Sequence, residues 1–305
     1  MSGGSSKLEN VLIHSNVAGS FGGGIYCGSP HITMTNVTIT DNTSNAVGGG
    51  IYFSYQNFGD LDERPIITNS IIWHNYPQEL NSYDPVGNFE GSFEIGYSNI
   101  ENGQDSIIVE GSSGPVWGSG NIDINPMFVD TANGNYHLLA SSMLINAGHP
   151  DSTDSDGTRA DIGAHPYLNT YSGPIWVVEE SGGNDINGTG AEDNKFASIQ
   201  AAINFASDGD SVSVWPGTYY ENINFRGRNI KVVGYEWTTG QNPVIDGGAN
   251  GSVVTFNSGE NNNAFLSEFI IQNGAGIDYE NNGSISGGGI FILQASPTLS
   301  NLFFR

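Results

Sequence analysis

Four aspartates in one short stretch of the chain are the residues best suited to bind a metal ion. Residues 149–165 read HPDSTDSDGTRADIGAH, and their carboxylates belong to Asp151, Asp154, Asp156 and Asp161. In an EF-hand calcium loop, ligands occupy the third and fifth positions and glycine the sixth, as Asp154, Asp156 and Gly157 do here. The match is incomplete, because Ser152 occupies the first position and Gly163 the twelfth. The pattern predicts that the four carboxylates and nearby backbone carbonyls bind Ca²⁺. An acidic turn without metal is the alternative.

The other charged residues do not form a recognisable catalytic set. Arg226 and Arg228 flank Gly227, where we expect a turn between strands. The insertion NFGDLDERP is expected to be a solvated loop, with a binding loop as the alternative. Its charged residues are Asp60, Asp62, Glu63 and Arg64. The six histidines show no His-x-x-x-His spacing, so a zinc site is not expected, and no residue is assigned a catalytic role.

The composition excludes several classes of partner. The 305 residues include 32 Asp and Glu against 8 Lys and Arg, a formal net charge of −24. Such a surface repels phosphate backbones, so we expect no nucleic-acid partner. The chain contains no run of about 18 apolar residues, so membrane insertion is not expected. The single cysteine, Cys27, cannot form an internal disulfide and is expected to pack in the core.

Two motifs that recur 26 residues apart indicate the elements that must position these side chains. The glycine block GGGIY begins at Gly22 and again at Gly48, and GGGIF begins at Gly287. A stretch with asparagine at both ends occupies residues 10–16, 36–42 and 69–75. Repeats of this length are typical of solenoids, in which each unit buries its apolar face against the next. Because glycine and asparagine disfavour helix, the repeat predicts an all-β solenoid.

The glycines and asparagines are expected to form the corners of the coils. Glycine adopts positive φ and lets the backbones of stacked coils approach closely. Asparagine tolerates the left-handed region, and its amide can hydrogen-bond to the equivalent residue of the next coil. The apolar residues also change parity at Thr35-Asn36, which predicts a strand, a bend and a second strand.

One amphipathic helix is predicted in the second half of the chain. Phe196, Ile199 and Ile203 form its apolar stripe, Asn194 is the expected N-cap, and the helix should end before Asp208-Gly209. A strand and further repeats follow it. A helix at this place covers the open end of a new solenoid.

In the predicted order of segments, the closing segment of one solenoid precedes the opening cap of another. Residues 1–167 are expected to be closing coils and a C-terminal segment, and residues 168–174 a linker. Residues 175–305 are expected to be the N-terminal cap and opening coils of a second solenoid. The chain is therefore interpreted as a fragment of a longer tandem protein, or as a circular permutant whose halves wind one solenoid.

Residues 196–222, FASIQAAINFASDGDSVSVWPGTYYEN, resemble the opening cap of the pectin-lyase-like right-handed parallel β-helix superfamily. They are most similar to the caps of bacterial secreted β-helix-repeat proteins. Residues 125–167 are similar to the superfamily's closing segment, and the GGGIY units to its coils. The resemblance implies a right-handed parallel β-helix with one short capping helix. It does not imply one activity, because a single fold hosts many chemistries.

The resemblance limits the functions that we expect. Lyases of this fold use Arg or Lys with Asp-bound Ca²⁺, and the hydrolases use clustered Asp, but no aligned coils of this chain bring such residues together. We expect a non-catalytic extracellular or cell-surface module that is adhesive, structural or glycan-binding, with a polysaccharide or cell-surface glycan as partner. The alternative is a polysaccharide lyase or glycoside hydrolase whose site is incomplete in this chain.

Overall fold

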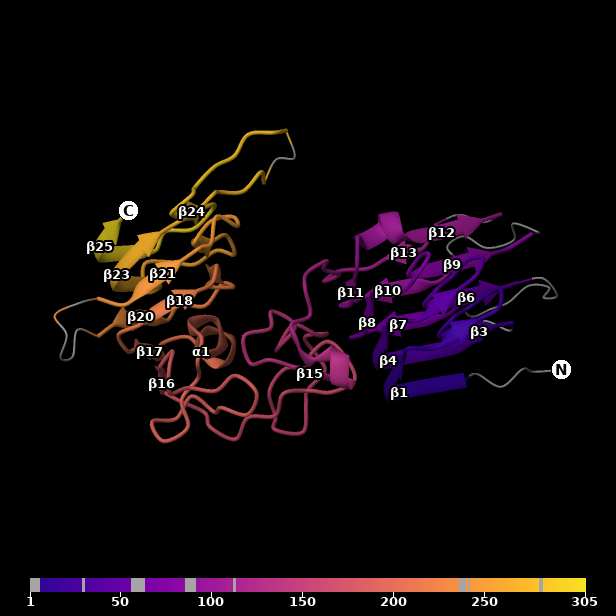
Figure 1. The fold of residues 1–305 in the computed structure, drawn as a ribbon, viewed down its shortest axis with the longest axis horizontal. Coiled ribbons are helices and arrows are strands. Elements are labelled where there is room, and N and C mark those ends of the chain that lie inside the picture. The colour runs from indigo at the N-terminus through magenta and orange to yellow at the C-terminus, as the bar shows by residue number, and fades with distance from the viewer. Residues whose placement is uncertain are drawn as a thin grey trace. The chain divides into compact units, whose positions relative to one another are not determined.

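The computed structural model describes residues 6–28, 31–55, 64–85, 92–111, 114–235, 240, 242–279 and 282–305. Their structure is predominantly β, with parallel sheets and one α-helix (Figure 1). The chain divides into two compact units, Met1–Leu138 with Met143–Leu168 (unit 1) and Leu139–Ser142 with Asn169–Arg305 (unit 2). The assignment of these units to closing and opening ends of β-helices stays a prediction. Asp60, Asp62 and Glu63 lie outside the described residues.

The strands of unit 1 are short and mostly parallel. The first ten are β1 (Ser6–His14), β2 (Val17–Ala18), β3 (Ile25–Cys27), β4 (Ile32–Thr40), β5 (Thr43–Ser44), β6 (Ile51–Ser54), β7 (Ile66–Thr68), β8 (Ile71–Trp73), β9 (Leu80–Tyr83) and β10 (Glu94–Gly96). There follow β11 (Asn99–Ile100), the 3₁₀ turn η1 (Gly103–Ser106), β12 (Ile107–Glu110), β13 (Val116–Trp117), β14 (Phe128–Asp130), η2 (Thr131–Asn133) and β15 (Asn135–Leu138). Only β14 and β15 pair antiparallel among these strands.

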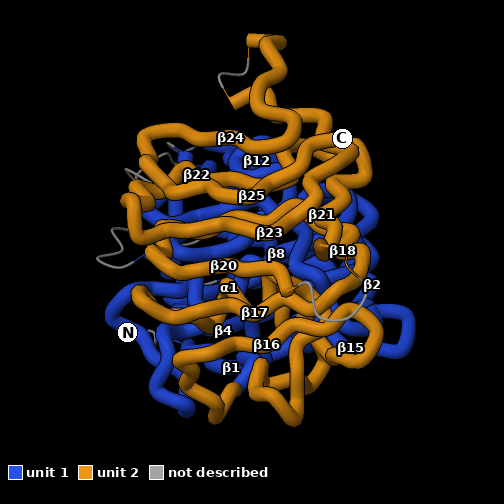
Figure 2. Tube along the Cα trace, turned by 90° about the vertical axis from the view of Figure 1, so that its left-hand side faces the viewer, with its two compact units in different colours: residues 1–138, 143–168 blue, residues 139–142, 169–305 orange. Residues whose placement is uncertain are grey.

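Successive coils of unit 1 stack in the register that the repeat predicts. Val11 of β1 lies opposite Val37 of β4, and Ile25 of β3 lies opposite Ile51 of β6, so both pairs are 26 residues apart. The inward apolar residues of these strands form one buried cluster, against which Cys27 packs, as expected. Parallel pairing of successive coils occurs in both units and is consistent with a β-helix-like solenoid. Figure 2 shows the stacked rungs of unit 2 in orange.

The bend predicted at Asn36 lies within β4. Asn36 has a φ of 53°, and the preceding half of β4 pairs with β7 while the following half pairs with β8. The equivalent Asn10 in β1 has a φ of 54° and accepts a hydrogen bond from the Asn36 amide at 3.1 Å. The left-handed asparagine therefore turns the chain from one sheet face to the next and ties two coils together.

The second asparagine of the motif forms a buried ladder across the coils. The Nδ2 of Asn16 donates to Oδ1 of Asn42 at 2.9 Å, and the Nδ2 of Asn42 donates to Oδ1 of Asn75 at 3.0 Å. The Nδ2 of Asn75 then donates to the Glu79 carboxylate at 2.6 Å. The ladder satisfies the polar groups of a coil corner that is buried at Asn42 and Asn75.

Unit 2 repeats the pattern after one helix. Its elements are β16 (Ile175–Val178), α1 (Ile199–Phe205), β17 (Ser211–Val214), β18 (Thr218–Tyr220), β19 (Ile223–Asn224), β20 (Lys231–Gly234), β21 (Val244–Asp246), β22 (Val254–Phe256), β23 (Phe265–Gln272), β24 (Ile290–Ile292) and β25 (Thr298–Phe304). The sheet β16-β17-β20-β23, extended by β25 and by the pair β21-β18, is parallel throughout, as is the sheet β19-β22-β24.

The helix α1 forms within the predicted segment and contains Ile199 and Ile203, but it begins after Phe196, and its cap differs. Ser198 is the N-cap, and its side chain accepts a hydrogen bond from the Ala201 N–H. The prediction of Asn194 as the cap is wrong because Phe196 is still extended and bridges to Val178. All seven helical residues are buried. No helix among the residues described has the length and apolar content needed to cross a membrane.

Candidate functional site

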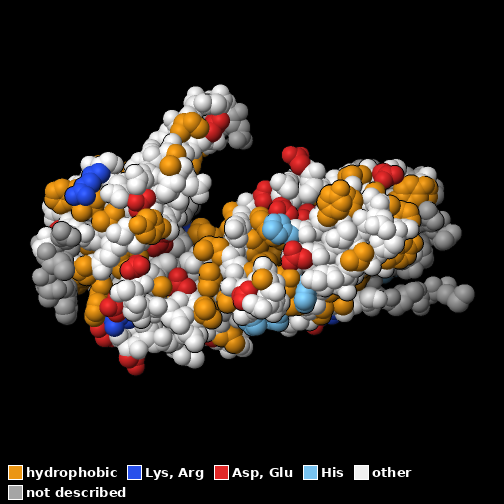
Figure 3. Space-filling model, viewed as in Figure 1, with side chains coloured by type: hydrophobic (Ala, Val, Ile, Leu, Met, Phe, Trp, Pro, Cys, Tyr) orange, Lys and Arg blue, Asp and Glu red, His pale blue; other side chains and the backbone are white. Residues whose placement is uncertain are grey.

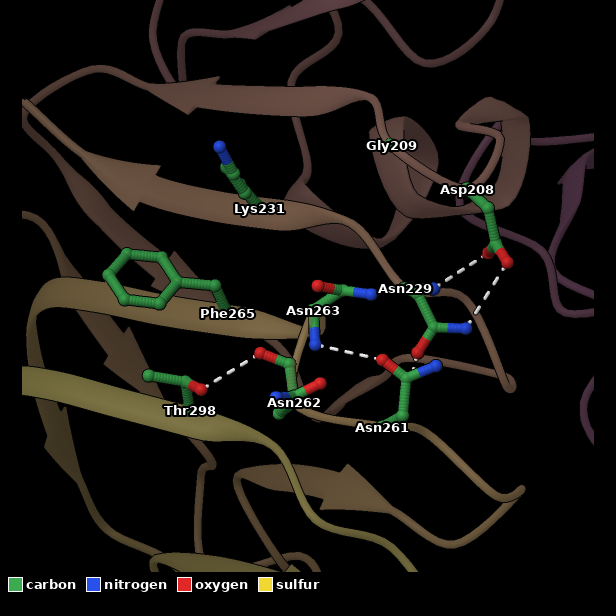
Figure 4. Close-up of a pocket in the computed structure, with 9 residues that line it drawn as sticks. All are labelled: Asp208, Gly209, Asn229, Lys231, Asn261, Asn262, Asn263, Phe265 and Thr298. Atoms are coloured by element: carbon green, nitrogen blue, oxygen red, sulfur yellow. Dashed lines mark hydrogen bonds between the residues drawn. The ribbon is translucent and has the colours of Figure 1, made fainter.

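An open pocket of about 660 Å³ lies on the described part of unit 2. It is lined by Asp208, Gly209, Asn229, Lys231, Asn261, Asn262, Asn263, Phe265 and Thr298 (Figure 4). Asp208 and Asn229 lie at one end of it, Lys231 and Phe265 at the other, and the three consecutive asparagines between them. The lining thus combines amides, one carboxylate, one ammonium group and one aromatic ring.

Stacking in register brings these residues together. Lys231 of β20 pairs with Phe265 of β23, and Phe265 pairs with Thr298 of β25, so one column of side chains runs across three coils. The remaining lining residues come from the loops that lead into β17, β20 and β23. Because parallel strands of one sheet begin at the same edge, their preceding loops converge there.

Hydrogen bonds between neighbouring coils hold the polar end of the pocket. The backbone N–H and the side-chain amide of Asn229 donate to the two Asp208 carboxylate oxygens at 2.8 and 3.2 Å. These bonds lower the pKa of Asp208, which is therefore ionised at neutral pH. The Asn229 side-chain oxygen accepts from the Asn261 N–H at 2.8 Å, and the Asn261 side-chain oxygen accepts from the Asn263 N–H at 2.8 Å.

Other groups in the pocket remain available to a ligand. Thr298 donates to the backbone oxygen of Asn262 at 2.9 Å, so this hydrogen bond does not involve the Asn262 side chain. Within the described ranges, no hydrogen bond or ion pair engages the side-chain amides of Asn262 and Asn263 or the ammonium of Lys231. The Phe265 ring is half-buried beside them. The site therefore offers donors, acceptors and an apolar face on a positioned framework.

Three of the four predicted calcium ligands are held mainly by hydrogen bonds to the backbone. Asp161 is 2% exposed, and its two oxygens accept from the N–H groups of Asn146 and Tyr167, both at 2.7 Å. Asp154 accepts from the Asp161 N–H at 2.8 Å, and Asp156 accepts from Thr158. Asp151 is exposed. In the described part of the chain no three His, Cys, Asp or Glu side chains are arranged to hold a metal, so calcium binding here stays a prediction.

Calcium binding at this turn predicts a change in thermal stability. If Asp151, Asp154, Asp156 and Asp161 bind Ca²⁺, 2 mM CaCl₂ should raise the melting temperature above that in EDTA, because a ligand of the native state stabilises it by mass action. Differential scanning fluorimetry measures the shift, and Asp156→Asn should reduce it. Equal melting temperatures in CaCl₂ and EDTA would contradict calcium binding and leave a hydrogen-bonded acidic turn.

Arg226 and Arg228 lie in a turn, as expected, and they hold the end of the cap helix. The Arg226 guanidinium donates to the Asn204 side chain at 2.7 Å. The Arg228 guanidinium donates to the backbone oxygens of Ala206 and Asn204, both at 2.8 Å. Cations at a helix C-terminus satisfy its last carbonyls and oppose its dipole. Both arginines are therefore tied to the fold.

A row of titratable side chains crosses one corner of unit 1. The Tyr136 hydroxyl donates to Asp41 at 2.8 Å, and the His74 ring nitrogens lie 3.7 Å from Asp41 and 3.5 Å from Glu101. Burial raises the pKa of Glu79 to about 8, and a hydrogen bond to Glu101 adds to the rise. Glu79 is only 2% exposed, so the carboxyl that stays protonated is closed to a substrate.

Buried carboxyl groups predict that the protein is more stable in mild acid than in mild base. Burial raises the pKa of Glu79 to about 8 and the pKa values of Asp161 and Glu221 to about 7. Because these values exceed those of the unfolded chain, the stabilisation is complete below about pH 4 and is lost as the pH rises through about 7 to 8. We expect the free energy of unfolding, measured by urea titration, to fall between about pH 5 and 8.5 by on the order of 1 kcal/mol per group.

Two variants test the origin of this pH dependence. Glu79→Gln removes one titration and should make the dependence shallower. Glu94→Gln changes an exposed glutamate of the same unit and should leave the dependence unchanged. If the stability of Glu79→Gln depends on pH as steeply as that of the unmodified protein, Glu79 does not contribute to the pH dependence.

The pocket was not predicted from the sequence, although one signal pointed to it. Aligning the coils of unit 2 places Lys231, Phe265 and Thr298 at one outward position, and the asparagine-rich loops just before it. Comparisons with protein-family models, curated proteins and solved structures give no match.

Proposed function

We propose that this chain is a non-catalytic module of an extracellular or cell-surface protein, and that it binds glycan in the pocket of unit 2. The pocket carries the proposal, because amides beside an aromatic ring match the hydroxyl groups and apolar ring faces of sugars. The side chains of Asn262 and Asn263 supply donors and acceptors, and Phe265 supplies a stacking face. An adhesive or structural role follows from such binding on a repetitive scaffold.

We also propose that both stacks belong to the pectin-lyase-like right-handed parallel β-helix superfamily. The 26-residue register of unit 1 supports this assignment, as does the buried asparagine ladder at one corner. In unit 2 the support is a cap helix followed by coils that pair in parallel. A crystal structure that shows the opposite hand of winding would overturn it.

The composition of the pocket favours binding over catalysis. Glycoside hydrolysis needs two carboxyl groups with different protonation states, one on each side of the scissile bond. Asp208 is the only carboxylate among the nine lining residues, and both of its oxygens accept hydrogen bonds from Asn229. Lys231 stands at the other end of the pocket with no acid beside it in the lining. A bound sugar would therefore be held without being cleaved.

Affinity electrophoresis tests the binding proposal. Native gels that contain a soluble plant or microbial polysaccharide should slow the unmodified protein relative to gels without it. The Asn262→Ala and Phe265→Ala variants should migrate equally in both gels. Asn250→Ala and Phe303→Ala are matched controls, because both residues are exposed and lie outside the pocket lining. Absence of retardation in every polysaccharide, or retardation unchanged by the pocket variants, would contradict glycan binding at this site.

A polysaccharide lyase or glycoside hydrolase is the second candidate. The pair of His74 and Glu101 is the observation that favours it, because a carboxyl oxygen lies 3.5 Å from a ring nitrogen and both side chains reach solvent. Release of unsaturated uronates or new reducing ends from polysaccharide, abolished in Glu101→Gln, would establish this activity and overturn the non-catalytic proposal.

A further inference from the structure

We infer that the pocket selects neutral sugars with hydroxyl and acetamido groups, and that it rejects polyuronates; this inference rests on the proposed glycan binding. Three observations carry it: the charge of the lining, the chemistry of the uncommitted groups and the stacking of those groups along the coils.

The charges around the pocket oppose an acidic polymer. Its lining contains one ammonium, Lys231, and one ionised carboxylate, Asp208, so the two balance. The chain as a whole carries a formal net charge of −24. On the face shown in Figure 3, Asp and Glu side chains are scattered widely whereas Lys and Arg are few. A chain with one carboxylate per sugar would meet this negative field with a single cation to offset it.

The uncommitted groups suit a neutral sugar. A side-chain amide donates two hydrogen bonds and accepts two, so Asn262 and Asn263 can pair with hydroxyl or acetamido groups whichever way these point. The Phe265 ring can cover the apolar face of a pyranose. The ammonium of Lys231 can donate to a hydroxyl, and its stem adds apolar contact. None of these interactions needs a negative charge on the ligand.

The column of side chains suits a linear oligosaccharide. Lys231, Phe265 and Thr298 occupy the same position on three successive coils, which lie about 4.8 Å apart. That spacing is close to the length of one sugar in an extended chain. A ligand that runs along the stack can therefore place successive sugars on successive coils.

Calorimetry with defined hexasaccharides tests the selectivity. Xylohexaose and chitohexaose represent neutral chains, and hexagalacturonate represents an acidic one. We expect at least one neutral hexasaccharide to bind about tenfold more tightly than hexagalacturonate. Its Kd should change by less than about twofold between 50 and 500 mM NaCl, because screening affects charged pairs. Asn262→Ala should weaken binding by about fivefold, as the loss of one or two neutral hydrogen bonds does.

Charge variants separate failure of this inference from failure of the proposed function. Lys231→Gln should weaken neutral binding by less than about threefold, and Lys7→Gln, in the other unit, should leave it unchanged. The inference is overturned if the protein prefers hexagalacturonate and this binding is lost in Lys231→Gln but not in Lys7→Gln. Glycan binding would then still stand. If the folded protein binds neither class of sugar, the proposed function itself fails.

Discussion

Asn42→Ala is expected to destabilise unit 1 by about 3–5 kcal/mol, because buried polar groups that lose their partners carry a large desolvation cost. Asn42 is 0% exposed. Its Nδ2 donates to the backbone oxygens of Ile13 and Thr40, both at 3.0 Å, and to Asn75. Its Oδ1 accepts from the backbone and side chain of Asn16 at 3.0 and 2.9 Å. Alanine removes this donor from carbonyls of two coils, although the Thr40 oxygen still accepts from the Ser15 N–H at 3.3 Å. It also interrupts the ladder between the coils.

The same substitution at the exposed end of the ladder is the matched control. Asn16 is exposed, and its side chain donates to the His14 carbonyl, to which water can donate instead. It also donates to Asn42, whose Oδ1 still accepts from the Asn16 backbone N–H in the variant. Asn16→Ala should therefore cost about 1 kcal/mol. Urea unfolding followed by tryptophan fluorescence and circular dichroism measures both variants. Equal losses at Asn42 and Asn16 would mean that burial of the ladder does not set its contribution.

The coil register could be predicted from the sequence because it depends on residues that recur. The 26-residue interval that separates Asn10 from Asn36 also separates Asn16 from Asn42, and both pairs are hydrogen-bonded. The end of the ladder could not be predicted in the same way. Its last acceptor is Glu79, which lies four residues beyond Asn75 and has no counterpart in the motif.

The cap and the pocket show why the remaining features were harder to predict. Either Ser198 or Asn194 could cap a helix, and only the extended conformation of Phe196, bridged to Val178, decides between them. The pocket depends on loops of unequal length that meet at one sheet edge. Exposed loop residues follow no apolar period, so a single sequence does not show which of them converge.

Gly49→Ala tests the close approach of coils at the glycine block, and we expect it to cost about 2–4 kcal/mol, because an overpacked backbone contact cannot relax by rotating a side chain. A Cβ at Gly49 would lie within 2.5 Å of the Tyr76 backbone nitrogen and closer still to its carbonyl group. Gly48 serves a different need, since its φ is 65°. The first glycine of the block therefore turns the chain, and the second lets the next coil pack against it.

Gly19→Ala is the matched control for this prediction, because Gly19 precedes the equivalent block and a Cβ there meets no atom within 4 Å. It should leave the urea midpoint of unit 1 almost unchanged, or raise it slightly through the lower entropy of the unfolded chain. If Gly49→Ala is as stable as Gly19→Ala, the coils can separate at this corner without cost. The close spacing of stacked backbones would then not explain why the glycine block recurs.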